Sequence, residues 1–156
     1  MARVGFDPTV VNDVAATFVL GQVLDYGGKL YRYGQYIDSA AIGPAANGAV
    51  MTFATGTGYT FTGDRAGGTS IGTNYCAGVA VGPITALYFG FLQVAGPHLS
   101  VLQAAGGVAV DKQVVVHTVT DFNAGSPPGT VADVPFGYCI VASAGGVIGV
   151  QIRGIV

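Results

Sequence analysis

Charged residues are scarce in this chain, and glutamate is missing altogether. Among 156 residues there are six Lys or Arg and eight acidic residues, all of them Asp, so charges make up 9% of the sequence. Ordinary soluble domains contain about 25%. From Ala66 to Val110 there is no charged residue at all. A monomer needs charge spread over its surface to remain soluble, so we expect much of the outside to be buried against other chains, in an oligomer or a larger assembly.

The few cations do not cluster. The six Lys and Arg residues are scattered from Arg3 to Arg153, and the net charge is −2. Proteins that bind nucleic acid gather cations into a patch or stripe, because those cations must neutralise phosphates. The sequence therefore predicts no nucleic-acid partner.

Patterns that carry catalysis or hold metals are also missing. The two cysteines lie far apart and so do the two histidines, whereas zinc sites use closely spaced pairs. Asp121–Gly125 resembles the start of a calcium loop but lacks a third oxygen ligand and a closing Glu. We interpret His98, after Gly-Pro, as a turn residue, and His117 as a hydrogen-bonded strand residue. We predict no catalytic residue, no metal, no cofactor and no enzymatic activity.

The cysteines are expected to be reduced. Asp7, Pro8 and Asp13 interrupt any apolar stretch that a signal peptide would need, so we expect synthesis and folding in the cytoplasm. Cys76 and Cys139 each follow a tyrosine in an apolar run. Their predicted role is that of small buried hydrophobes, and a disulfide between them is the alternative.

The uncharged segment from Gly78 to Gly96 is long enough to cross a membrane. It contains four glycines, a proline and Gln93, with β-branched and aromatic residues between them. This composition favours buried strands over a transmembrane helix, so no membrane partner is predicted.

Glycine punctuates the whole chain, with 26 residues, and helical periodicity is nearly absent. Frequent turn residues between short apolar runs are typical of all-β domains. We predict one domain, residues 1–156, folded as a compact β-barrel or β-sandwich of about ten short strands, with an extended N-terminal arm over residues 1–15. Residues 16–37 should form a hairpin around Gly27-Gly28. The best helix candidates are residues 8–16 and 39–48.

Tyrosines on a β face can stack on sugars, and the hairpin contains several. Tyr31 and Tyr33 fall on one face of the expected strand and Tyr36 on the other. Cross-strand packing is the favoured interpretation. A small lectin-like binding module presenting Tyr31 and Tyr33 is the alternative.

The run from Tyr88 to Gly96, YFGFLQVAG, places Gly90 and Phe91 before Gln93 and Gly96. It resembles a strand motif of small auxiliary head proteins of tailed bacteriophages, in which a segment like GVAVG at residues 78–82 also precedes the motif. The hairpin LGQVLDYGGKLYRYGQY and the closing GVIGVQIRGIV are similar to the early and last strands of that group. Together these stretches cover about half of the chain.

This resemblance implies a capsid decoration or cement protein, with Gly90, Phe91, Gln93 and Gly96 as structural residues of the motif. Such proteins are compact β modules, often trimeric, that bind the outside of the head where major capsid proteins meet. The expected partners are other copies of this chain and the major capsid protein. The expected location is the capsid surface of the virion, after assembly in the host cytoplasm. A tail-tube, fibre or head-completion protein is the alternative within phage structural proteins.

Overall fold

The computed structural model describes residues 7–38, 44–54, 59–64, 75–116, 123–125 and 134–154. Ten strands in these ranges form one hydrogen-bonded sheet, and the single helical element described is a 3-10 turn, η1 (Pro8–Val10). The predicted all-β fold is confirmed. In chain order, the strands are β1 (Val23–Tyr26), β2 (Lys29–Tyr36), β3 (Val50–Phe53), β4 (Thr60–Thr62), β5 (Cys76–Ala80), β6 (Phe89–Leu102), β7 (Gln113–Val116), β8 (Ala124–Gly125), β9 (Gly137–Ala144) and β10 (Val147–Ile152).

Strands β1 and β2 form the hairpin that the sequence predicts. Gly27 and Gly28 join them with φ of 62° and 74°, the two positive values that a type I′ turn requires. Alternation along β2 then sends Tyr31 and Tyr33 to one face, and Tyr36 to the other. Only the strand bounds differ from expectation, because β1 begins at Val23 and not at Ala16.

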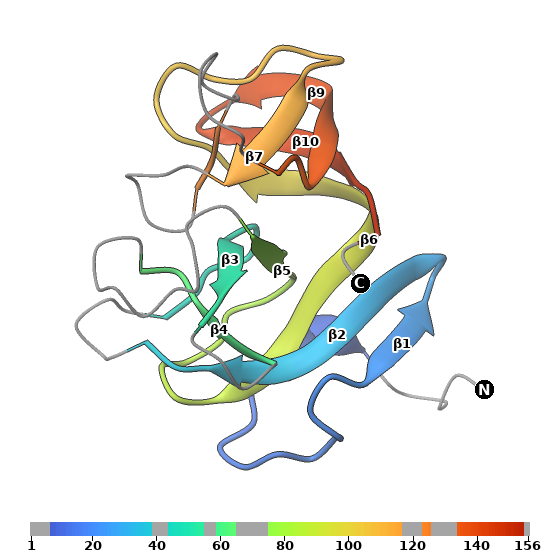
Figure 1. Cartoon of the computed structure of the whole chain (residues 1–156), viewed down its shortest axis with the longest axis vertical. Coiled ribbons are helices and arrows are strands. Elements are labelled where there is room, and N and C mark those ends of the chain that lie inside the picture. Colours follow the sequence, from blue (N-terminus) through green and yellow to red (C-terminus); the bar gives the residue numbers. More distant parts are fainter. Residues whose placement is uncertain are drawn as a thin grey trace.

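Five strands close into a ring through their pairings. β2 pairs with β4, β4 with β3, β3 with β5, β5 with β6, and β6 returns to β2. These strands fill the lower half of the molecule in Figure 1. One buried cluster contains side chains from several strands of the ring, among them Tyr36, Met51, Phe61 and Leu92.

The second half of the sheet starts from the far part of β6. β10 pairs with β6, β9 with β10, β7 with β9 and β8 with β7. Just beyond β6, Gln103 bridges Ala124 of β8, and the N–H of Ala104 donates to the carbonyl of Ala124 at 3.0 Å. This group forms the upper half in Figure 1, and β6 is the strand that runs through both halves.

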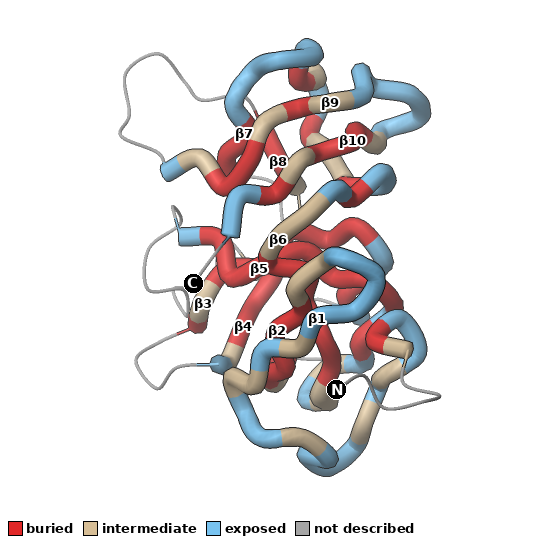
Figure 2. The backbone as a smooth tube through the Cα atoms, turned by 90° about the vertical axis from the view of Figure 1, so that its right-hand side faces the viewer, coloured by how far each residue is buried: buried red, intermediate tan, exposed pale blue. Residues whose placement is uncertain are grey.

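A shared hydrophobic core joins the halves. Val50 and Val79 of the ring lie in one buried cluster with Val114, Ile148 and other residues of the upper strands. The tube coloured by burial shows this red interior running from the ring into the upper half (Figure 2). Cys76 and Cys139 belong to the same cluster and form no disulfide. Their predicted role as small buried hydrophobes is confirmed, and the alternative of a disulfide is wrong.

Strand β6 corrects the interpretation of His98. From the sequence, Gly96-Pro97 indicates a turn that contains His98. In the structure β6 continues through all three residues, because Gly96, Pro97 and His98 pair with Ile152, Gln151 and Val150 of β10. Pairing with a neighbouring strand thus overrides the local Gly-Pro turn signal. His98 is a buried strand residue, 7% exposed.

The expected helices are nearly absent. From residues 8–16 only η1 is helical, capped by the Asp7 carboxylate, which accepts from the N–H of Thr9 at 2.9 Å. Residues 39–43 of the other candidate lie outside the described residues, and residues 44–48 form a bridge and a turn.

The described part of the expected N-terminal arm lies against its own domain. Asp13 exchanges both main-chain hydrogen bonds with Phe89, and the Asn12 side chain bonds to Thr85. Residues 1–6 are outside the described ranges. Across the described residues, no helix combines the length and hydropathy needed to span a membrane.

Gly48, just before β3, comes very close to the far part of β6. It has a φ of 85°, and a Cβ there would lie 1.7 Å from the carbonyl oxygen of Ser100 on β6. We expect Gly48→Ala to lower the free energy of unfolding by about 3 kcal/mol or more, since backbone strain and a main-chain clash add. Gly27→Ala is the control, because Gly27 also has positive φ but open space around it. It should cost about 1 kcal/mol. Equal costs in urea unfolding would contradict this account.

Burial of His98 predicts a pH dependence of stability. Burial, the largest cause, and the nearby charge of Lys29 lower its pKa to about 4 from 6.5, although a hydrogen bond to the backbone of Ala80 acts in the opposite direction. Between these pH values the unfolded chain binds the proton more strongly than the folded one. The free energy of unfolding should therefore be highest above pH 6.5 and fall by about 3 kcal/mol as the pH drops to 4. In chemical denaturation at several pH values, His98→Gln should lose this decrease in the free energy of unfolding between pH 6.5 and 4. An unchanged pH dependence in the variant would refute the assignment.

Candidate interaction surface

The motif residues of β6 build the interior. The ring of Phe91 lies 5.0 Å from Tyr33 and 5.2 Å from Phe18, centroid to centroid. The buried amide of Gln93 donates to the carbonyl oxygens of Ala95 at 3.2 Å and Pro97 at 3.1 Å. Gly90 and Gly96 allow close approaches, because a Cβ would meet Ile84 at 2.8 Å and Lys29 at 3.1 Å, respectively. The structure thus brings these residues together along one strand, where they pack and bend it and present no surface site.

The tyrosines considered for sugar binding are also interior. Tyr31 is 5% exposed and Tyr33 is fully buried. The Tyr33 hydroxyl donates to the Asp13 carboxylate at 3.0 Å and accepts from the N–H of Thr17 at 3.2 Å. Neither ring is available to stack on a sugar, so the lectin-like alternative loses the residues on which it depended.

No group of three His, Cys, Asp or Glu that could hold a metal occurs among the described residues. His117 and Asp121–Phe122 lie outside those residues.

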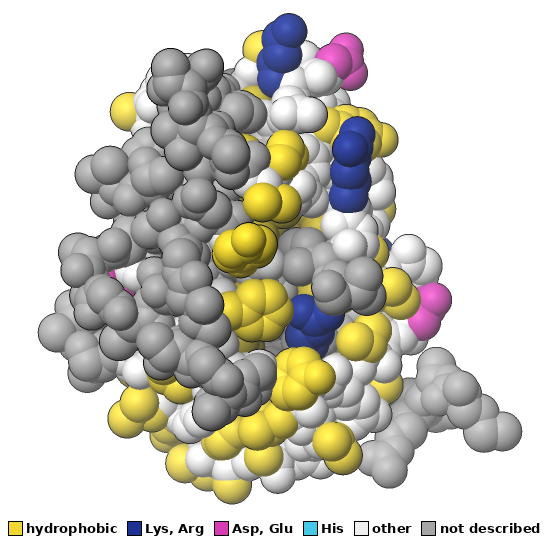
Figure 3. Space-filling view, viewed as in Figure 1, with side chains coloured by type: hydrophobic (Ala, Val, Ile, Leu, Met, Phe, Trp, Pro, Cys, Tyr) yellow, Lys and Arg dark blue, Asp and Glu magenta, His cyan; other side chains and the backbone are white. Residues whose placement is uncertain are grey.

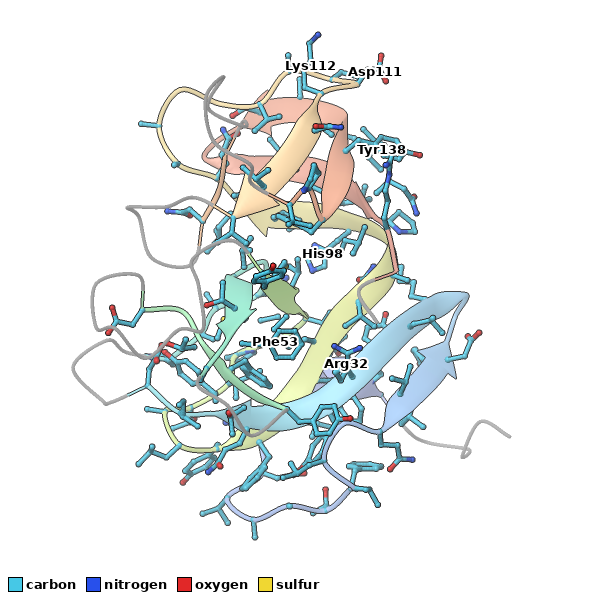
Figure 4. The ribbon with its side chains drawn as sticks, viewed as in Figure 1. Arg32, Phe53, His98, Asp111, Lys112 and Tyr138 are labelled. Atoms are coloured by element: carbon cyan, nitrogen blue, oxygen red, sulfur yellow. The ribbon has the colours of Figure 1, made fainter. Side chains whose placement is uncertain are left out.

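Arg32 is the most deeply buried cation in the described ranges. Its guanidinium lies 5.7 Å above the centre of the Phe53 ring, and Figure 4 shows the two side chains facing each other across the ring of strands. Burial lowers the pKa of the guanidinium from its ordinary value. A cation stacked on an aromatic ring in this way stabilises packing between β2 and β3.

One surface is defined by exposed large hydrophobic residues from three segments that are distant in sequence, and we call it the apolar end. Its members are Val10, Val14, Val19, Leu20, Tyr59 and Leu87, which are 39–76% exposed. In Figure 3, the lower end of the molecule shows hydrophobic and uncharged atoms and no Lys, Arg or Asp colour.

Specific contacts hold the three segments together. The Asn12 amide donates to the Thr85 hydroxyl at 2.9 Å, and the N–H of Thr85 donates back to the Asn12 side chain at 2.9 Å. Gln35 connects the other two segments, because its N–H donates to the carbonyl of Tyr59 and its amide to that of Leu87. These hydrogen bonds therefore connect the three segments that carry the apolar end.

Two of its residues have strained backbones. Leu87 and Tyr59 have φ of 69° and 76°, in the left-handed region that glycine or asparagine normally fills. Leu87 occupies the third position of a turn closed by the hydrogen bond from Tyr88 N–H to Thr85 carbonyl. A positive φ at the third residue is typical of type II turns, which favour glycine or asparagine there. Keeping a leucine there costs about 1–2 kcal/mol and leaves its side chain 58% exposed.

The apolar end has the features of a protein-contact surface. Contiguous exposed apolar side chains are typical of sites that bind other proteins. Asp13, the nearby acid, already accepts hydrogen bonds from Tyr33 and Thr17. Sequence analysis missed this surface because its three segments are distant in sequence, and contacts such as the one between Asn12 and Thr85 become visible only in the fold.

Strain at Leu87 can be measured. Leu87→Gly should raise the free energy of unfolding by about 1 kcal/mol, since glycine adopts the positive φ without a steric cost. Leu99→Gly, at an exposed leucine within β6, should instead lower it by about 0.5–1 kcal/mol, because glycine weakens a strand. Thermal unfolding of both variants at low protein concentration tests the contrast. Loss of stability in both would show that Leu87 contributes contacts that outweigh its strain.

No protein-family model, no curated protein and no solved structure matches this chain.

Proposed function

We propose that this protein is a structural protein of a bacteriophage particle, a decoration or cement protein that binds the head surface as a homo-oligomer and stabilises the shell. Its partners are other copies of itself and the major capsid protein, and its place is the outside of the virion. The observation that carries the proposal is the apolar end, where strained, exposed hydrophobic residues stand on a rigid support. The resemblance of the β6 motif to auxiliary head proteins supplies the particular biological setting.

The composition supports an assembly role independently of that resemblance. With 9% charged residues, the chain has little with which to cover a free surface. A cement protein uses one surface for its own oligomer and another for the shell, so low charge suits it. Several weak contacts per oligomer then combine through effective concentration into very slow release from the head.

Rigidity also fits this role. Both halves of the sheet pair with β6, and the ring closes on itself, so main-chain hydrogen bonds connect one end of the module to the other. A module that holds capsid subunits together against internal pressure needs this property more than it needs a moving part. The resemblance further implies a trimer, in which three apolar ends would act together.

Head binding tests the proposal. Purified protein is added to heads of the phage that encodes it, assembled without the protein, and the bound fraction is measured after sedimentation. Val14→Asp and Leu87→Asp should each reduce binding at least tenfold, because each places a charge in the apolar contact. Asp tolerates the left-handed backbone at position 87, so folding should be preserved.

Leu99→Asp is the matched control. Leu99 is 66% exposed but lies ten residues along β6 from Phe89, away from the apolar end. It should bind heads like the wild type. Wild-type protein that does not sediment with the heads, or head binding that survives both apolar-end variants, would reject the proposal.

A further inference from the structure

Strand β1 is an open edge of the sheet. The strand order runs from β1 to β8, and β8 is closed on its outer side by the bridge between Ala124 and Gln103. Among the described residues, β1 pairs with β2 alone. Figure 1 shows β1 on the outside of the ring, and in Figure 2 its backbone has the colours of exposed and half-buried residues. An edge of this kind can pair with a further strand.

The main-chain groups that this edge offers follow from the hairpin. The N–H of Tyr33 donates to the carbonyl of Gln22 at 3.0 Å, so this carbonyl points toward β2. Pairing alternates along an antiparallel strand, and the register Leu24↔Tyr31 and Tyr26↔Lys29 gives Leu24 and Tyr26 the same direction. The N–H and carbonyl groups of Val23 and Asp25 therefore point away from the sheet.

Two common forms of edge protection are missing from β1. β1 contains neither Pro nor Lys, the residues with which proteins often block edge pairing. Two of its hydrophobic side chains are also exposed to solvent, Val23 by 42% and Tyr26 by 40%. On the N-terminal side the edge ends at Gly21, whose N–H donates to the carbonyl of Tyr33 and so points inward.

We propose that two copies of this protein pair through β1, antiparallel, around a two-fold axis at Leu24. Val23 of one copy lies opposite Asp25 of the other, and the reverse pair forms on the other side of the axis. Each of these pairs exchanges two main-chain hydrogen bonds, so the contact has four. The two Leu24 side chains meet at the axis, beside the Tyr26 and Tyr31 rings, whose centroids are 6.5 Å apart.

Self-complementarity selects a second copy as the occupant. In the Leu24-centred register, all outward main-chain groups of β1 find partners, and an isologous contact uses the same patch twice. A register centred on Asp25 would place two carboxylates opposite each other, which is destabilising. A register centred on Val23 would place Asp25 opposite Gly21, whose N–H already donates to Tyr33. That register would keep only two of the four main-chain hydrogen bonds. A two-fold contact does not itself build the proposed trimer, so it would join copies from different oligomers. The inference does not rest on head binding.

A cross-linking experiment tests the register in the full chain. Leu24→Cys places two thiols at a non-hydrogen-bonded antiparallel pair, where β-carbons are close enough for a disulfide. Mild oxidation should convert most of this variant to a covalent dimer on a non-reducing gel. Val23→Cys and Asp25→Cys are the controls and should cross-link at least fivefold less, because each faces a different residue. The native Cys76 and Cys139 are buried and should not contribute.

A second variant checks the hydrogen bonds. Asp25→Pro removes an outward N–H, which an edge strand tolerates, while the pairing of β1 with β2 is kept. The dissociation constant of the pair should rise at least tenfold by light scattering across a dilution series. Circular dichroism confirms that each variant is folded. A folded Leu24→Cys that gives no dimer, stronger cross-linking at position 23 or 25, or unchanged association of Asp25→Pro would each overturn the inference.

Discussion

Strand β6 is the element on which both halves of the fold depend. Up to Ala95 it pairs with β2, and from Gly96 it pairs with β10. This change of partner needs a bend, which the positive φ of Gly96 provides. The buried amide of Gln93 donates to carbonyls on both sides of that glycine, at Ala95 and Pro97. One side chain therefore supplies hydrogen bonds where the ladder changes partner, and buried main-chain groups need such partners.

The uncharged stretch of the sequence has a physical explanation in this arrangement. Its described part contains β5 and β6, which contribute to all three buried clusters. A strand that packs on both faces cannot carry charge without a large desolvation cost. Burial does not account for the whole stretch, however, because Tyr75, Leu87 and Leu99 are exposed by more than half. The low charge thus has two origins, an interior shared between two halves and a surface left apolar.

Features of the fold that depend on neighbouring residues in the chain were predictable from the sequence. The Gly27-Gly28 turn, the opposite directions of Tyr33 and Tyr36, and the all-β class follow from turn geometry and strand alternation. Sequence patterns could not show that Gly96-Pro97 lies inside a strand, since that depends on the distant partner β10. Nor could they place Leu87 in a left-handed conformation, because the turn around it has no glycine at that position. The candidate surface was missed for the same reason, as its members meet only in three dimensions.

The open edge and the apolar end supply different parts of what a specific protein contact requires. Main-chain pairing along β1 fixes register, but two outward-facing residues bury little area, and stable interfaces need about 1,000 Å² or more. The apolar end supplies exposed hydrophobic area but little that fixes orientation. Val19 and Leu20 lead directly into β1 through Gly21 and Gln22, and the N–H of Gln22 donates to the carbonyl of Val19 at 2.9 Å. The chain therefore connects the surface that gives affinity to the edge that gives geometry, and a contact at one constrains how a partner can approach the other.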